Sequence, residues 1–161
     1  MFTTTTDGRI LHGHDDGHDG ARHFHLSGLA GAATGAGLAV AMLAPLLFLS
    51  KLAGMQFVAV QLGFIGAIYF GFGIADGRVM KLLVEFLSAG AFLFVAVAAL
   101  WADSPALLAG AYGAHALWDL IHHPRSATVP VRNWYPPFCV AFDLVCAAFI
   151  LVWLPLGGVG H

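Results

Sequence analysis

The amino-acid sequence contains few charged side chains. Only 10% of its 161 residues are Asp, Glu, Lys or Arg, whereas 59% are hydrophobic. Soluble domains average roughly 25% charged residues, so the composition excludes an ordinary water-soluble domain. The net charge of −2 and the absence of a basic cluster also exclude a typical nucleic-acid-binding protein. The composition therefore indicates a polytopic membrane protein.

Features that would define several other classes are also missing. The first 25 residues are polar, acidic and rich in His rather than basic and then apolar, so no cleavable signal peptide is expected. Cys139 and Cys146 lie in one apolar segment, about 10 Å apart along a helix, which is too far for a mutual disulfide. The sequence has no haem-attachment motif, phosphate-binding loop or nucleophile elbow.

Long apolar runs separated by short polar turns predict an all-α bundle of about five transmembrane helices. About 20 apolar residues are enough for a helix to cross a bilayer. Residues 1–25 form a polar tail rich in His, Asp and Gly, and residues 26–157 form the transmembrane domain. Small residues at Gly28, Gly31 and Gly35 predict close packing of the first span on a neighbour. The expected spans are 26–49, 52–75, 79–101, 105–123 and 137–156.

The distribution of Lys and Arg predicts the orientation of this bundle. Only Lys51 lies on the side opposite the N-terminus, and the N-terminal side carries Arg9, Arg22, Arg78, Lys81, Arg125 and Arg132. Lys and Arg are enriched on the cytoplasmic side, so we expect a cytoplasmic N-terminus and an external C-terminus in the inner (plasma) membrane. The expected partners are the lipid bilayer and, through the small-residue faces, other membrane proteins or a second copy.

Ionisable side chains gather in the cytoplasmic halves of the last three spans. The set comprises Glu85 in the third span, His115, Asp119, His122 and His123 in the fourth, and Asp143 in the fifth. Helical geometry places Asp119 and His122 within about 40° of His115 and puts His123 at the edge of that face. Polar groups are costly inside a bilayer, so they are functional candidates by default. The sequence thus predicts one site shared by three helices.

Imidazole and carboxylate groups together favour a divalent-metal site. Zinc is the preferred ion and non-haem iron the alternative, because both accept these ligands and keep positions open for water or substrate. His115, Asp119, His122 and Asp143 are the expected ligands, with His123 as an alternative ligand. Glu85 is the expected proton-transfer group beside an activated water. Two other interpretations stay open: a structural network without chemistry, and a ligand, haem or proton-relay site.

Three sequence segments and Glu85 carry a resemblance to known proteins. The segments are F-G-F-G-I-A-D-G-R (70–78), H-A-L-W-D-L-I-H-H-P (115–124) and W-Y-P-P-F-C-V-A-F-D (134–143). They resemble a family of small bacterial integral membrane proteins of unknown function, over about residues 55–153. The resemblance implies a helical membrane protein and no particular activity. The gathering of His and Asp residues at one membrane face also distantly resembles the arrangement in alkaline ceramidases and progestin-receptor-like hydrolases. Those proteins have seven spans.

Two functions follow as expectations. The preferred one is a metal-dependent enzyme, hydrolytic in type, that acts on a lipid or another membrane-dissolved substrate. The alternative is a non-enzymatic membrane subunit that binds a cofactor or packs against partner membrane proteins. Retained metal together with a lipid-shaped cavity at the site would favour the enzyme, whereas a closed, dry and fully hydrogen-bonded polar network would favour the subunit.

Overall fold

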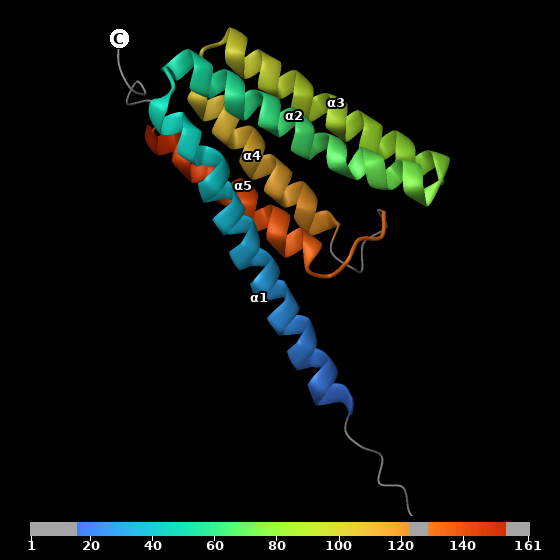
Figure 1. Cartoon of the computed structure of the whole chain (residues 1–161). Coiled ribbons are helices and arrows are strands. Elements are labelled where there is room, and N and C mark those ends of the chain that lie inside the picture. Colours follow the sequence, from blue (N-terminus) through green and yellow to red (C-terminus); the bar gives the residue numbers. More distant parts are fainter. Residues whose placement is uncertain (1–15, 123–128, 154–161) are drawn as a thin grey trace, which may run out of the picture.

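A computed structural model describes residues 16–122 and 129–153 as a bundle of helices (Figure 1). Within these residues the chain forms five α-helices and one 3-10 helix, with no β-strand. The elements are α1 (Asp16–Leu43), η1 (Ala44–Phe48), α2 (Lys51–Asp76), α3 (Val79–Trp101), α4 (Pro105–Ile121) and α5 (Tyr135–Trp153). The predicted all-α fold is therefore confirmed.

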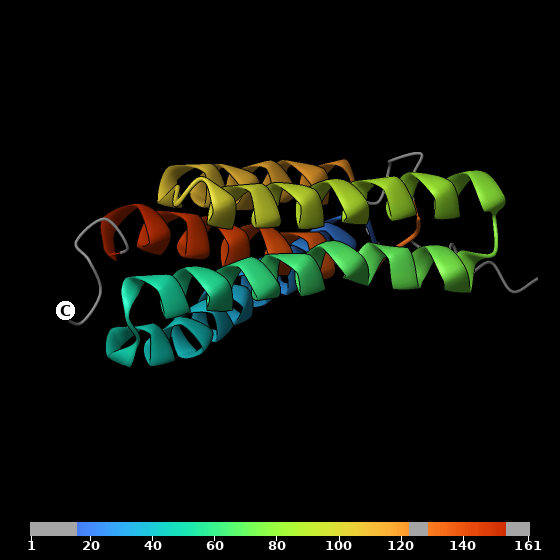
Figure 2. The same cartoon turned by 90° about the horizontal axis from the view of Figure 1, so that it is seen from above.

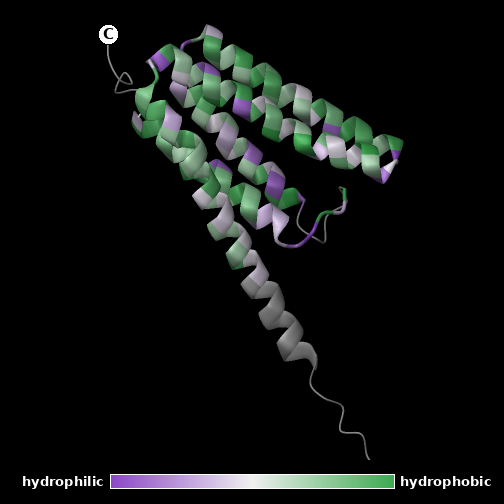
Figure 3. Ribbon diagram, viewed as in Figure 1, coloured by the Kyte–Doolittle hydropathy of each residue, from purple (hydrophilic) through white to green (hydrophobic). Residues whose placement is uncertain are grey.

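Four segments in the described part of the chain are long and apolar enough to cross a membrane. They are Ser27–Phe48, Lys51–Asp76, Val79–Trp101 and Tyr135–Trp153. Helix α4 has 17 residues, which is the lower limit for a spanning helix. Figure 3 shows hydrophobic residues along most of the bundle and polar residues at the turn between α2 and α3. These helices indicate a membrane protein.

The helix boundaries differ from the predicted spans at three places. Helix α1 begins at Asp16, inside the stretch predicted as a polar tail. Helix α4 ends at Ile121, and His122 caps it in a non-helical conformation. Helix α5 begins at Tyr135, so two prolines lie in its first turn, where the amide hydrogens that they lack have no helical acceptor.

Helix packing joins two units through α4. One unit is α1 packed along α5, and the other is α2 packed along α3 (Figures 1 and 2). Helix α4 packs along α5 and also contacts α3 and α2. By contrast, α1 and α2 follow each other in the chain yet make at most marginal contact within the described residues. A space between these two helices is therefore left for other side chains or a ligand.

Glycines bring α1 close to α5. A Cβ atom at Gly31 would collide with the backbone carbonyl of Trp134, and one at Gly35 with that of Phe138. Small residues allow this approach because no side chain separates the two backbones. The predicted close-packing face on the first span is thus confirmed, and its partner is α5.

We expect Gly35→Ala to destabilise the bundle. The added methyl group would meet the Phe138 carbonyl, and overpacking of this kind costs about 1–3 kcal/mol. Gly37→Ala is the matched control, because a Cβ at Gly37 meets nothing within 4 Å. Unfolding of detergent-solubilised protein by a denaturing detergent would measure both variants. Equal stability of the two variants would contradict the close contact between α1 and α5.

Candidate functional site

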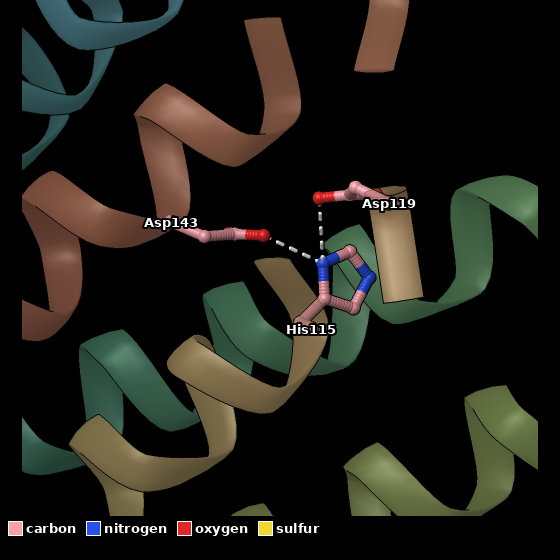
Figure 4. Close-up of side chains that lie close together, drawn as sticks. All are labelled: His115, Asp119 and Asp143. Atoms are coloured by element: carbon pink, nitrogen blue, oxygen red, sulfur yellow. Dashed lines mark hydrogen bonds and ion pairs between the residues drawn. The ribbon is translucent and has the colours of Figure 1, made fainter. Parts of the chain in front are cut away.

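His115 of α4 lies between two carboxylates. Its Nδ1 atom is 2.7 Å from Asp143 Oδ2 and 3.4 Å from Asp119 Oδ2 (Figure 4). Asp119 is one turn further along α4, and Asp143 comes from α5. The three side chains are buried, with exposures of 2%, 0% and 1% for His115, Asp119 and Asp143. We call these three residues the His–Asp–Asp group.

The His–Asp–Asp group carries an unbalanced charge in this arrangement. A contact of 2.7 Å between His115 Nδ1 and Asp143 Oδ2 requires a shared proton, because two lone pairs would repel each other. Neither oxygen of Asp119 has a hydrogen-bond partner. An imidazolium with two ionised carboxylates leaves a net charge of −1, which is costly away from water. The group therefore favours an added cation or a second proton.

The spacing of the same three residues suits a metal ion. One ligand atom from each residue can be chosen so that all lie within 4.8 Å of one another. Tetrahedral zinc with bonds of about 2.0 Å separates its ligand atoms by about 3.3 Å. The two separations from His115 Nδ1, 2.7 and 3.4 Å, bracket this value. A divalent cation would also cancel both carboxylate charges.

His122 belongs to a separate pair with Glu85 of α3. Its Nε2 atom is 2.8 Å from Glu85 Oε1, and its Nδ1 atom is 2.9 Å from the Trp118 carbonyl oxygen. The carbonyl can only accept, so Nδ1 carries a hydrogen and a single proton is shared between Nε2 and Glu85. The pair is neutral wherever that proton lies. Because both ring nitrogens are engaged, His122 has no nitrogen left for a metal in this arrangement.

Tyr69 of α2 lies between the His–Asp–Asp group and the Glu85–His122 pair. Its ring stacks on His122, with centroids 3.9 Å apart and planes inclined by 28°. Its buried hydroxyl interacts electrostatically with Asp119. The sequence does not single out Tyr69, because an uncharged aromatic residue in an apolar helix is an ordinary packing residue. The only feature of the sequence that points to Tyr69 is its position directly before the 70–78 segment.

An apolar groove of about 810 Å³ reaches the His–Asp–Asp group from the side of the bundle. It runs between α1 and α2, and side chains of α4 and α5 form its floor. His115 and Asp143 line it together with Tyr69 and Cys139. The Glu85–His122 pair and Asp119 are not part of this lining. The groove therefore reaches the His–Asp–Asp group on the side formed by His115 and Asp143, although both side chains are almost completely buried.

The structure divides the predicted site residues between two neighbouring groups. His115, Asp119 and Asp143 form the first, and Glu85 and His122 form the second. His123 lies outside the described residues. Spacing along the sequence placed His122 on the face of His115, but α4 ends before His122 and the cap turns its ring toward α3.

The fold and this site together define a membrane-type helical bundle with a buried imidazole–carboxylate centre beside an apolar groove. The chain belongs to the family of unknown function DUF6010, whose family model matches residues 30–156. The resemblance to a family of unknown function is thus confirmed, and the match includes every residue of both groups. Searches of the curated proteins and of the solved structures each found no match.

We expect the Glu85–His122 pair to behave as one unit in stability measurements. His122→Phe leaves Glu85 buried without its partner, which should cost about 3–5 kcal/mol. Glu85→Gln should cost far less, because an amide N–H can still donate to His122 Nε2. The double variant His122→Phe with Glu85→Leu should recover part of the loss. With Glu85→Leu also measured alone, additive effects of His122→Phe and Glu85→Leu would show that the two side chains are not coupled.

Proposed function

We propose that the protein is a metal-dependent membrane enzyme that hydrolyses a lipid or another membrane-dissolved substrate. The observation that carries this proposal is the end of the apolar groove, where His115 and Asp143 form part of the lining. Such a groove can deliver an apolar molecule to buried polar groups. A purely structural polar network has no need of access from the side.

His115, Asp119 and Asp143 would hold the metal ion. Three protein ligands leave a fourth position for water, as in catalytic zinc sites. Zinc is favoured, with iron as the alternative, because one imidazole and two carboxylates suit both ions. The ion would activate a water molecule and polarise a carbonyl oxygen of the substrate. Its two positive charges also make the buried group neutral, which supports metal binding on electrostatic grounds.

Glu85 would exchange protons from behind the site. It does not line the groove, so direct contact with the substrate is not proposed for it. The proton that it shares with His122 can move without creating net charge. Tyr69, which stacks on His122 and lines the groove, lies on the path between this pair and the substrate. In the proposed orientation, Arg78 and Lys81 place this end of α3 at the cytoplasmic face of the inner (plasma) membrane.

The alternative is a non-enzymatic membrane subunit. The Glu85–His122 pair supports it, because this pair joins α3 to α4 with both ring nitrogens satisfied. The His–Asp–Asp group supports the enzyme instead, because both oxygens of Asp119 lack hydrogen-bond partners and the neighbouring groove is open. The two groups thus favour different functions, and the metal content separates them.

We expect the purified protein to contain close to one equivalent of zinc or iron by elemental analysis. His115→Ala and Asp119→Asn should each remove nearly all of it, because each variant removes a proposed ligand. Loss of a group outside the coordination sphere costs only about 10–100-fold in affinity, so a near-complete loss marks a true ligand. Glu85→Gln should keep the metal and lose hydrolysis of a long-chain fatty acyl ester. Chelation should likewise stop hydrolysis by the unaltered protein.

One control concerns the histidines near the N-terminus, which could bind metal on their own. A variant with Asn at His12, His14, His18, His23 and His25 should retain the metal. Metal that disappears in this variant but persists in Asp119→Asn would contradict the proposed site. A protein without metal, whose variants fold and insert normally, would leave only the structural role.

A further inference from the structure

The groove has the length of a lipid chain. One face of α2 forms its wall from Ala53 to Tyr69, about 24 Å along the helix axis. The hydrocarbon core of a bilayer is about 30 Å thick. The α2 face repeats at helical spacing, because its members are Ala53, Gln56, Phe57, Val60, Gln61, Phe64, Ile65, Ile68 and Tyr69. The groove is therefore a straight channel along the bundle rather than a round pocket.

The groove has a volume of about 810 Å³ spread along about 24 Å of α2. These dimensions leave room for a linear hydrocarbon chain.

The mouth of the groove faces the surroundings of the bundle through apolar side chains. Val60, Phe64 and Ile68 of α2 and Leu38 and Met42 of α1 are all exposed. In a membrane these side chains would meet lipid, so a lipid chain could move into the groove sideways. The lining also includes two polar side chains of α2, Gln56 and Gln61, and the Oε1 atom of Gln61 lies 3.0 Å from the buried Tyr112 hydroxyl.

The ionisable side chains that line the channel lie at one end of it. His115, Asp143 and Tyr69 line this end, whereas Leu49 and Ala53 line the other. A linear molecule in the groove would therefore place a polar group beside the His–Asp–Asp group and an apolar chain along α2. An amphiphile with its polar group at one end and one long chain has this distribution.

We propose that the substrate is a membrane lipid ester whose single long acyl chain lies in the groove between α1 and α2, with the ester group beside His115 and Asp143. This inference rests on the proposed function of the same site. Hydrolysis breaks the bond between the acyl carbon and the alcohol oxygen. Water supplies a hydroxyl group to the acyl carbon and a proton to the departing oxygen, so the products are a fatty acid and an alcohol.

Photoaffinity labelling of the whole protein in phosphatidylcholine nanodiscs would test this inference. The probe is a long-chain fatty acyl methyl ester with a diazirine on its chain, and the labelled peptides are mapped by mass spectrometry. We expect label on the groove segments of α1, α2 and α5. Excess methyl oleate should reduce the amount of this label at least about tenfold, which corresponds to about 1.4 kcal/mol. Label from bulk lipid contact, including that on the outer face of α3, should resist competition.

Two variants that fill the groove provide independent checks. Val60→Trp should reduce the competable label at least about tenfold, and Leu87→Trp on the exposed surface of α3 is its matched control. Ala53→Phe blocks the end of the groove remote from the His–Asp–Asp group. It should therefore weaken competition by methyl oleate, whose chain is long, and leave competition by the shorter methyl octanoate unchanged. The two variants alter different positions, so misfolding of one leaves the other as a test.

The outcomes separate this inference from the proposed function, provided that metal content is measured in the same samples. Bound metal without competable label in the groove would overturn the acyl-chain assignment alone. Competable label in a protein without metal would support the chain site and overturn the hydrolase. Label spread evenly over every outward face, with no response to methyl oleate, would show only ordinary contact with bilayer lipid and would also overturn the assignment.

Discussion

Two aspartates sharing one imidazole, buried together on adjacent helices, are the constraint on which the site depends. Asp119 and Asp143 would repel each other if both were ionised without a cation nearby, and the 2.7 Å contact of His115 with Asp143 supplies only one proton. The neighbouring Glu85–His122 pair does not relieve this imbalance, because it is neutral by itself. A divalent ion bound to all three residues would stabilise both the local charge and the packing of α4 on α5.

Helix packing connects this charged centre to the groove. Gly31 and Gly35 bring α1 against α5, and α2 packs on α3 instead of on α1. The space between α1 and α2 is thus a consequence of which helices pack together, and it ends at the buried His115. The same helix, α5, provides the partner surface for α1 and carries Asp143. A change in the packing of α1 would therefore alter both the width of the groove and access to the site.

The sequence predicted the fold and much of the site for clear physical reasons. Apolar runs of spanning length define helices, and helical spacing placed Asp119 beside His115. The same reasoning could not separate His122 from that group, because its ring direction depends on where α4 ends. The sequence could not predict the role of Tyr69, because an uncharged aromatic residue in an apolar helix does not stand out from packing residues. It could not predict the groove either, because the groove depends on which pairs of helices do not pack together.

X-ray absorption at the edge of the bound metal would test the central claim most directly. We expect one imidazole nitrogen and otherwise oxygen ligands at about 2.0–2.2 Å, and we expect this spectrum to be lost in Asp143→Asn. A spectrum with several imidazoles or with sulfur, or one unchanged in Asp143→Asn, would contradict a metal centre built from His115, Asp119 and Asp143.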